Sequence, residues 1–298
     1  MSGRNGQDTN DSVQLNDTTT MKRMTFSLAA LLCIAAVSCS HRDDSLPKIS
    51  IFCYHIETLA RQEKISFAEA ATRVKEFGYT GADIRVTQKP EEIKTLDSLG
   101  FAHACAISEI NYSREDTKEM EDRTLAFMEE RGFDQLLLIP GLMPEEGLSK
   151  DERDAARQRM ASFAKRVTDR GYKVLVEDFD NARSLCYNAE LIDTLFTVSK
   201  DIGLVFDTGN FQFAGQDAME QYEHFRPKIG HVHLKDRTSP TDMRCVAVGT
   251  GCIPIVEIIH RLQDSGYEGW FTFEEYGTRT MLKDCEESYL NISAALAE

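Results

Sequence analysis

The chain has 298 residues, of which 42% are apolar and 28% are charged, a composition typical of a globular protein with a large core. Its formal net charge of −15 argues against binding to a nucleic-acid backbone, which requires clustered lysines and arginines. One barrel domain of about 250 residues would account for most of this length.

The beginning of the chain predicts export. Two basic residues precede an apolar stretch at 26–37, and the sequence Ala-Val-Ser-Cys that ends at Cys39 resembles the cleavage signal of bacterial lipoproteins. The stretch is shorter than a comfortable membrane span. We therefore expect residues 21–38 to be a signal peptide and Cys39 to become the lipidated N-terminus. A short buried helix is the alternative, although no polar face interrupts the run.

Two further segments flank this signal. Residues 1–20 form a polar extension, and Met21 is a candidate for the true start. Residues 39–48 are polar and would tether the domain to the lipid. These expectations place the protein in the bacterial cell envelope, lipid-anchored and either periplasmic or associated with the outer membrane. The lipid would be its only contact with a membrane.

Six cysteines follow Cys39, and they are scattered along the chain. Cys53 and Cys105 lie in strand-like runs, where buried free thiols are expected. Cys245 and Cys252 flank one loop, and an oxidising envelope permits disulfides, so the sequence leaves open whether they pair. The absence of a CxxC motif argues against a zinc or redox site built from cysteines.

From Ile49 onward, short apolar runs alternate with segments of helical periodicity. Strands are predicted at 49–53, 81–86, 101–107, 135–139, 173–177, 204–207, 229–234 and 270–274. Helices are predicted at 67–77, 91–99, 120–128, 151–170, 188–200, 217–225, 255–262 and 281–296. Glycines such as Gly78 and Gly171 follow several of these helices, because glycine tolerates the positive φ of a helix end.

Strands that alternate regularly with helices predict parallel pairing with right-handed crossovers. The strands consist of consecutive apolar residues, as expected for strands buried on both faces. We therefore predict an α/β fold in which residues 49–298 form a single (β/α)8 TIM barrel. A doubly wound open sheet is the alternative, and the lack of a glycine-rich first turn disfavours it.

Four strand-like runs in the second half of the chain carry metal-ligand side chains at their ends. KVLVE ends at Glu177, GLVFD at Asp207 and WFTFE at Glu274, while GHVHL carries His233 near its end. In a parallel barrel such strand ends converge on one face, where active sites are built. Two Glu, one Asp and one His suit an octahedral site for a hard or borderline divalent cation. An ion pair or a turn cap would explain any one acid, but the four ends together favour a metal site.

Residues near these strand ends are candidates for further roles. Lys235 follows His233 and would stabilise a developing oxyanion, with a solvated loop lysine as the alternative. His231 shares a strand face with His233 one layer deeper, so it is a candidate either for substrate contact or for a hydrogen-bonded core position. His55 and Asp83 lie within or just past the first two strands and are candidates for contact with substrate hydroxyls.

Five motifs occur in barrel-like order and spacing: VLVED, FDTGNF, GHVHLKDR, GTGCIP and GYEGWFTFEEY. Through them the chain from Ile49 onward resembles the xylose isomerase-like TIM-barrel superfamily of sugar isomerases and epimerases, which includes endonuclease IV. The resemblance implies a divalent metal ion, Mn²⁺, Mg²⁺, Co²⁺ or Zn²⁺, bound by Glu177, Asp207, His233 and Glu274. It also implies that the two glutamates serve as catalytic acid and base.

The chain departs from this family at two places. Many members carry histidine three residues after the strand-six aspartate, where this chain has Asn210, which we assign to substrate binding. Histidine is also frequent after the strand-five glutamate, where this chain has Asp178 and Phe179. Both differences concern substrate contacts and leave the four implied ligands in place.

These observations predict a metal-dependent isomerase or epimerase of a non-phosphorylated sugar or keto-sugar, because phosphorylated sugars are kept in the cytosol. The catalytic groups would be Glu177, Glu274 and Lys235, acting through an enediolate. A lyase or hydrolase of 3-keto-glycosides on the same site and a non-catalytic sugar-binding lipoprotein are the alternatives. Only 7 histidines and the charge of −15 disfavour a nuclease like endonuclease IV, so no nucleic-acid partner is expected. Whether the chain forms a homo-oligomer stays open.

Overall fold

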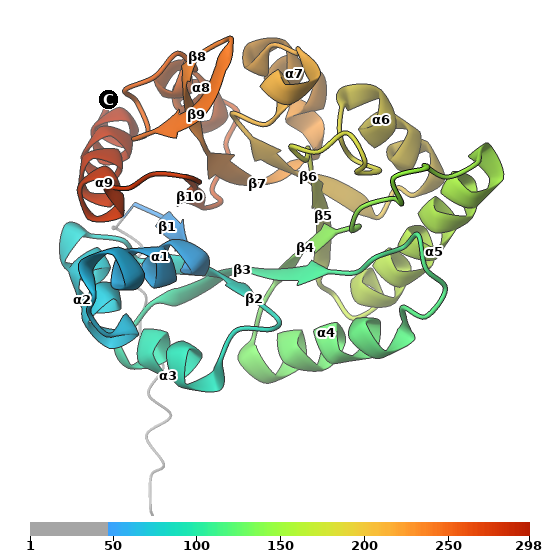
Figure 1. Cartoon of the computed structure of the whole chain (residues 1–298), viewed down its shortest axis with the longest axis horizontal. Helices are drawn as coiled ribbons and strands as arrows, with labels where there is room; N and C mark the ends of the chain where they lie inside the picture. Colours follow the sequence, from blue (N-terminus) through green and yellow to red (C-terminus); the bar gives the residue numbers. More distant parts are fainter. Residues whose placement is uncertain (1–46) are drawn as a thin grey trace, which may run out of the picture. The chain divides into compact units, whose positions relative to one another are not determined.

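Residues 47–298 are described by a computed structural model, and their eight parallel strands close into a barrel (Figure 1). Around the barrel the strands follow the order β1-β10-β7-β6-β5-β4-β3-β2. Their bounds are Ile49–Phe52 for β1, Gly81–Arg85 for β2, Ala102–Glu109 for β3, Gln135–Ile139 for β4, Lys173–Glu177 for β5, Ile202–Asp207 for β6, Ile229–Leu234 for β7 and Phe271–Phe273 for β10. The predicted TIM barrel is confirmed.

Helices surround the strands, as Figure 1 shows. Their bounds are Cys53–Glu63 for α1, Phe67–Phe77 for α2, Pro90–Ser98 for α3, Lys118–Arg131 for α4, Lys150–Thr168 for α5, Ala189–Val198 for α6, Ala218–Phe225 for α7, Ile255–Asp264 for α8 and Met281–Ala297 for α9. Two short 3₁₀ turns, η1 (Phe211–Ala214) and η2 (Arg226–Lys228), flank α7.

The predicted export signal lies outside the described residues. This applies to the extension at 1–20, the signal peptide at 21–38, the lipidation site Cys39 and most of the tether. Within residues 47–298 no helix is long and apolar enough to cross a membrane.

Local side-chain and backbone features explain where helices α5 and α2 begin and end. Ser149 caps α5, because its side chain accepts a hydrogen bond from the Glu152 backbone N–H while the Glu152 side chain accepts one from the Ser149 backbone N–H. Gly78 ends α2 with a φ of 116°, a conformation that residues with a Cβ rarely adopt. The predicted and observed bounds of these helices therefore agree closely.

The largest departure from the sequence prediction is helix α1. Strand β1 ends at Phe52 and the helix begins at Cys53, with no turn residue between them. Ile56 and Leu59 are buried on one face of this helix, which stabilises it against the barrel. His55 consequently lies on a helix and not at the end of a strand.

The segment after β7 forms a hairpin that the sequence analysis did not predict. Strands β8 (Asp236–Ser239) and β9 (Asp242–Val246) pair antiparallel. The backbone N–H groups of Gly249 and Gly251 then donate hydrogen bonds to the Asp236 carboxylate at 3.0 and 2.8 Å. A Cβ at Gly251 would clash with that carboxylate, so the GTG motif folds around a side chain of this same chain.

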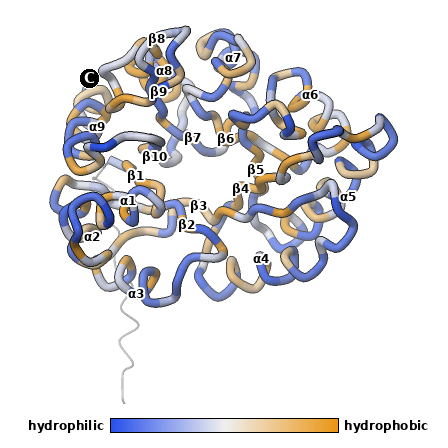
Figure 2. The backbone as a smooth tube through the Cα atoms, viewed as in Figure 1, coloured by the Kyte–Doolittle hydropathy of each residue, from blue (hydrophilic) through white to orange (hydrophobic). Residues whose placement is uncertain are grey.

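Alternate residues of the strands face the barrel interior. Six buried apolar residues of the interior form a cluster of their own: Phe52, Cys105, Ile107, Leu137, Leu175 and Val205. A larger apolar cluster joins the strands to the helices. In Figure 2 the hydrophobic strands β4 and β5 lie inside a ring of helices with hydrophilic outer faces. Polar residues at other inward positions form the site described below.

All six cysteines within residues 47–298 are free thiols. Cys53 and Cys105 are buried, as their positions in apolar runs predicted. Cys245 and Cys252 do not form a disulfide, and the Arg237 guanidinium lies 3.2 Å from the Cys245 Sγ as a hydrogen-bond donor.

Candidate active site

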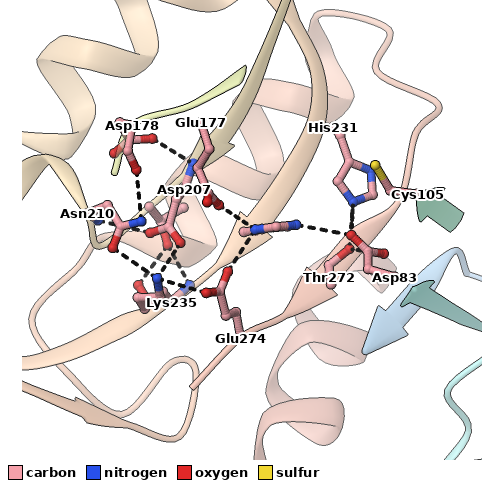
Figure 3. Close-up of polar contacts among 12 residues, drawn as sticks. Asp83, Cys105, Glu177, Asp178, Asp207, Asn210, His231, Lys235, Thr272 and Glu274 are labelled. Carbon is pink, nitrogen blue, oxygen red and sulfur yellow. Dashed lines mark hydrogen bonds and ion pairs between the residues drawn. The ribbon is translucent and has the colours of Figure 1, made fainter. Parts of the chain in front are cut away.

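The four strand-end side chains meet at one end of the barrel. Glu177 ends β5, Asp207 ends β6, His233 lies in β7, and Glu274 follows β10. One ligand atom from each of them lies within 4.8 Å of the others, and all four residues are buried. Figure 3 shows the Glu177, Asp207 and Glu274 carboxylates directed toward a common centre. The structure therefore brings together the residues that the sequence pattern singled out.

The His233 ring has carboxylates at both of its nitrogens. Its Nδ1 lies 2.5 Å from Glu177 Oε1 and 2.7 Å from Glu274 Oε2. Its Nε2 lies 3.1 Å from Asp83 Oδ2. Burial alone would lower the pKa of His233, but the surrounding carboxylates raise it well above its usual value. The Nδ1 atom therefore lies between two carboxylates, in a group of atoms that could hold a cation.

Asp83 orients two histidines within the barrel. Its Oδ2 accepts hydrogen bonds from His231 Nε2 at 2.8 Å and from His233 Nε2 at 3.1 Å, and its Oδ1 accepts one from the Thr272 hydroxyl at 3.2 Å (Figure 3). The Gln135 amide donates to His231 Nδ1 at 3.0 Å, which places the His231 proton on Nε2. The bond to Asp83 likewise leaves the Nδ1 lone pair of neutral His233 facing the acidic cluster. Metal-binding histidines are commonly oriented by such a carboxylate.

Buried acids outnumber the cations that contact them. The acids are Glu177, Asp178, Asp207 and Glu274. Lys235 Nζ lies 2.8 Å from Asp207 Oδ2 and 3.0 Å from Glu274 Oε1. Burial, opposed by His233 and reinforced by Glu274, raises the pKa of Glu177 to about 7. Burial would also raise the pKa of Glu274, but Lys235 and His233 hold it far below its usual value. Two neighbouring carboxylates with separated pKa values are a usual arrangement for proton transfer.

This donor set fits a divalent cation. Three carboxylates and one imidazole are ligands that Mg²⁺, Mn²⁺, Co²⁺ and Zn²⁺ accept. Two positive charges would also offset the buried acids that Lys235 leaves uncompensated. A second group of potential ligands, Asp83, His231 and His233, lies deeper in the barrel. The ligand atoms of this second group are already hydrogen-bonded to one another and to Thr272. The proposed site for a divalent cation is therefore the first group.

A cavity of about 640 Å³ opens onto the acidic cluster. Among the predicted site residues, those that line it are Glu177, Asn210, Lys235 and Glu274. Its apolar and aromatic lining is formed by Phe52, Ile107, Ile139, Phe179 and Tyr276, among others. A few polar groups under apolar walls are the usual form of a site for a small organic ligand.

Comparison with known proteins decides the family. The family described as the xylose isomerase-like TIM barrel matches residues 71–288, which is most of the chain. The chain belongs to this family. An inosose dehydratase from Lacticaseibacillus casei is 25% identical over 248 residues, which cover 71% of this chain and 83% of that relative.

Solved structures of the family share the barrel. An L-ribulose 3-epimerase superposes with a TM-score of 0.66 at 17% identity, covering 85% of this chain and 95% of its own. A xylose isomerase-like TIM barrel protein from Mycobacterium smegmatis, solved in complex with magnesium, gives a TM-score of 0.63 at 16% identity and covers 85% and 98% of the two chains. At these identities the likeness shows the fold. The relatives named in these comparisons include sugar epimerases and a dehydratase, and one family structure holds a metal ion.

Three of the predicted substrate contacts lie away from the cavity. His55, Asp83 and His231 are 0% exposed and take no part in its lining. Burial lowers the pKa of His55 to about 3, and its Nε2 accepts a hydrogen bond from the Glu275 backbone N–H at 3.1 Å. Asp83 and His231 bond to each other. Direct contact of these three residues with a substrate is therefore not supported by the geometry.

Asn210 lines the cavity, but its amide is engaged by the chain. Its Nδ2 donates to the Asp178 carbonyl oxygen at 2.9 Å. Its Oδ1 accepts hydrogen bonds from Lys235 Nζ at 2.9 Å and from the Arg237 guanidinium at 3.3 Å. Asn210 therefore holds Lys235 in place, in addition to any contact with a substrate.

Arg85 and Tyr276 are among the cavity residues that were not predicted from the sequence. Arg85 ends β2, two residues after Asp83, and both side chains consequently face the barrel interior. The two-residue spacing from Asp83 was the sequence signal that could have indicated Arg85 as a residue facing the interior. Tyr276 follows the last strand in an irregular segment, where no periodicity indicates the direction of a side chain.

Proposed function

We propose that this protein is a divalent-metal-dependent isomerase or epimerase of a small, non-phosphorylated sugar or keto-sugar. The proposal is carried by one observation, the convergence of Glu177, Asp207, His233 and Glu274 where the cavity meets the barrel. The family of the chain, which contains sugar epimerases, supports the same class of substrate.

The two glutamates are the proposed acid and base. Both line the cavity, and both lie beside the same imidazole nitrogen. One of Glu177 and Glu274 removes the proton next to the substrate carbonyl. The other returns it at the opposite face or at the neighbouring carbon. A divalent cation held by the four strand-end residues would polarise that carbonyl. Proton transfer by positioned side chains of this kind contributes roughly 10²- to 10⁴-fold to a rate.

Lys235 is the proposed stabiliser of negative charge on the substrate oxygen. It is 3% exposed, and its ammonium group is held by Asp207, Glu274 and Asn210. Since these contacts fix the ammonium group at the cavity surface, little reorganisation is needed when charge develops during the reaction. Burial of the Lys235 side chain strengthens this interaction, because charges attract each other more strongly where the dielectric constant is low.

A lyase or dehydratase is the second candidate, favoured by the similarity to an inosose dehydratase. The same proton abstraction next to a carbonyl would then expel a hydroxyl or glycosidic oxygen from the neighbouring carbon. The residues in the roles of base and oxyanion stabiliser stay unchanged. The products differ, since elimination gives an unsaturated ketone whereas epimerisation conserves the formula.

Proton exchange in heavy water tests the proposal. The protein is supplied with Mn²⁺ or Mg²⁺ and incubated with a panel of ketoses and keto-glycosides, and deuterium at the carbon next to the carbonyl is measured by NMR. We expect incorporation by the wild type and a loss of at least about 10²-fold in Glu274→Gln. A Glu274→Gln protein that binds metal normally and keeps full turnover would refute the assignment. A sugar-binding protein without catalysis would give binding and no exchange.

We also propose that the protein is exported and lipidated at Cys39, on the basis of the signal-like segment at 21–38. An envelope location would bring it into contact with free sugars and glycosides. Mass spectrometry of the protein from its native membrane would detect a diacylglyceryl group on Cys39. Recovery of an intact peptide that joins Ser38 to unmodified Cys39 would refute the location.

A further inference from the structure

Arg85 is a cavity cation that has no acidic partner among residues 47–298. It ends β2, lines the cavity and is half-buried. Within residues 47–298 its guanidinium makes no ion pair within 4.0 Å and donates no hydrogen bond. Lys235, the other basic residue of the lining, is by contrast committed to two carboxylates. The chain carries 49 acidic residues, so the lack of an ion pair at Arg85 does not reflect a shortage of acidic side chains.

Two aromatic rings fix the orientation of this guanidinium. Its Cζ lies 5.2 Å from the ring centre of Phe52 and 4.9 Å from that of Tyr54. Such stacking holds the planar group while leaving its N–H donors at the edge free. A guanidinium whose orientation is restricted before a ligand arrives loses less conformational entropy when the ligand binds. Arg85 therefore lies at the cavity beside two aromatic rings, and its N–H donors have no partner among the described residues.

None of the acidic residues of the lining, Glu109, Glu177, Asp180 and Glu274, lies within 4.0 Å of the Arg85 guanidinium as an ion-pair partner. Ser108 and Asn111, on and just after the adjacent strand β3, contribute neutral polar groups to the cavity. Glu109 also borders the cavity, but it is exposed and does not pair with Arg85. Holding a partly buried cation without a partner is unfavourable. A ligand that supplies the negative charge would remove this cost.

We propose that Arg85 binds a carboxylate of the substrate, so that the natural ligand is a sugar acid. This inference rests on the proposed function, because it assumes that the cavity takes a sugar. The two parallel N–H groups of a guanidinium match the two oxygens of a carboxylate, and one positive charge balances one negative charge. A phosphate monoester, with a charge of about −1.5 to −2, would leave surplus negative charge above the acidic cluster.

Binding measurements on matched pairs of sugars test this inference. Isothermal titration of the Mg²⁺-supplemented protein would compare D-glucuronate with D-glucose, D-galacturonate with D-galactose, and D-glucose 6-phosphate as the second anion. We expect the better uronate to bind roughly 10- to 100-fold more tightly than its neutral partner. Arg85→Met should remove that preference, and Arg85→Lys should keep part of it because the charge remains.

Arg61→Met is the matched control. The Arg61 guanidinium stacks on the same Tyr54 ring at 5.4 Å, but it is exposed and takes no part in the cavity lining. This variant should bind uronates as the wild type does. The inference is overturned if no uronate binds, if the neutral sugars or the phosphate bind as tightly as the uronates, or if Arg85→Met weakens both members of a pair alike. A uronate preference without proton exchange would refute the proposed catalysis and leave this inference standing.

Discussion

Substituting Asp83 by Asn would test whether one buried carboxylate organises the site. Asp83 is 0% exposed and accepts hydrogen bonds from His231 at 2.8 Å, His233 at 3.1 Å and Thr272 at 3.2 Å. Asparagine keeps one acceptor oxygen but replaces the other with an NH₂ group that faces donors. Hydrogen bonds to charged groups contribute about 1.5–3 kcal/mol each, and breaking a buried charged pair costs about 3–5 kcal/mol. Because one acceptor remains, we expect the free energy of unfolding to fall by about 2–4 kcal/mol.

Thermal unfolding and metal titration measure the two consequences of this change. For a barrel of this size, a loss of 2–4 kcal/mol corresponds to a fall in Tm of roughly 5–15 °C. The affinity for Mn²⁺ should fall by about 10- to 100-fold, because His233 loses the partner that directs its Nδ1. Asp97→Asn is the control, since Asp97 bonds to His103 Nε2 at 2.8 Å but its side chain is 42% exposed. Exposed pairs of this kind contribute about 0–1 kcal/mol.

The pH dependence of this effect has a definite sign. Burial would raise the pKa of Asp83, but His231 and His233 lower it to about 2 from the ordinary value of 3.8. Ionised Asp83 therefore stabilises the fold above about pH 4, and this contribution is lost as the pH falls through about 2. The difference in stability between wild type and Asp83→Asn should shrink over the same range. Equal Tm values and equal Mn²⁺ affinities at pH 7 would refute the role of Asp83, as would an equally large effect of Asp97→Asn.

Three further predictions concern the metal and the oxyanion. Lys235→Met should lower kcat by about 10²- to 10³-fold with a smaller change in KM, measured by steady-state kinetics, because charge on the substrate oxygen loses its partner. Chelation by EDTA should abolish turnover and lower the Tm. The affinity for Mn²⁺, measured by calorimetry, should weaken from pH 8 to pH 6, because His233 must lose a proton to bind metal. Gly209→Ala would place a Cβ 2.9 Å from the Lys235 carbonyl oxygen and should lower both Tm and kcat. An unchanged kcat in Lys235→Met or Gly209→Ala, or activity that survives complete removal of divalent metal, would contradict these expectations.

The proposed metal ligands at the strand ends were predictable because each lies at or near the end of an apolar run. Glu177 and Asp207 are the last residues of β5 and β6, so the change from apolar to acidic marks the end of the barrel directly. Helix α1 was not predictable in this way, because it begins at Cys53 with no capping side chain and no turn residue to separate it from β1. The hairpin β8-β9 was missed for a related reason, since both strands are short and β8 consists of polar residues.

The network around Asp83 depends on contacts across the barrel that no local pattern records. Asp83 belongs to β2, and the histidines that it orients belong to β7, more than a hundred residues later. Alternation along β2 indicates that Asp83 and Arg85 face inward, but not which strand lies opposite. Asp83, whose strand position suggested contact with substrate hydroxyls, therefore orients His233, a proposed metal ligand. Arg85, the next residue along the same face of β2, reaches the cavity.

The asparagine at position 210 constrains the chemistry of this particular site. Asn210 presents an amide, which neither gains nor loses a charge near neutral pH. Its oxygen instead accepts hydrogen bonds from Lys235 and Arg237. In the proposed mechanism proton transfer at the substrate therefore falls to the carboxylates at the cavity surface that contact His233, which are Glu177 and Glu274. The amide thus makes the two glutamates the decisive pair of the proposed mechanism, and it contributes to the position of Lys235.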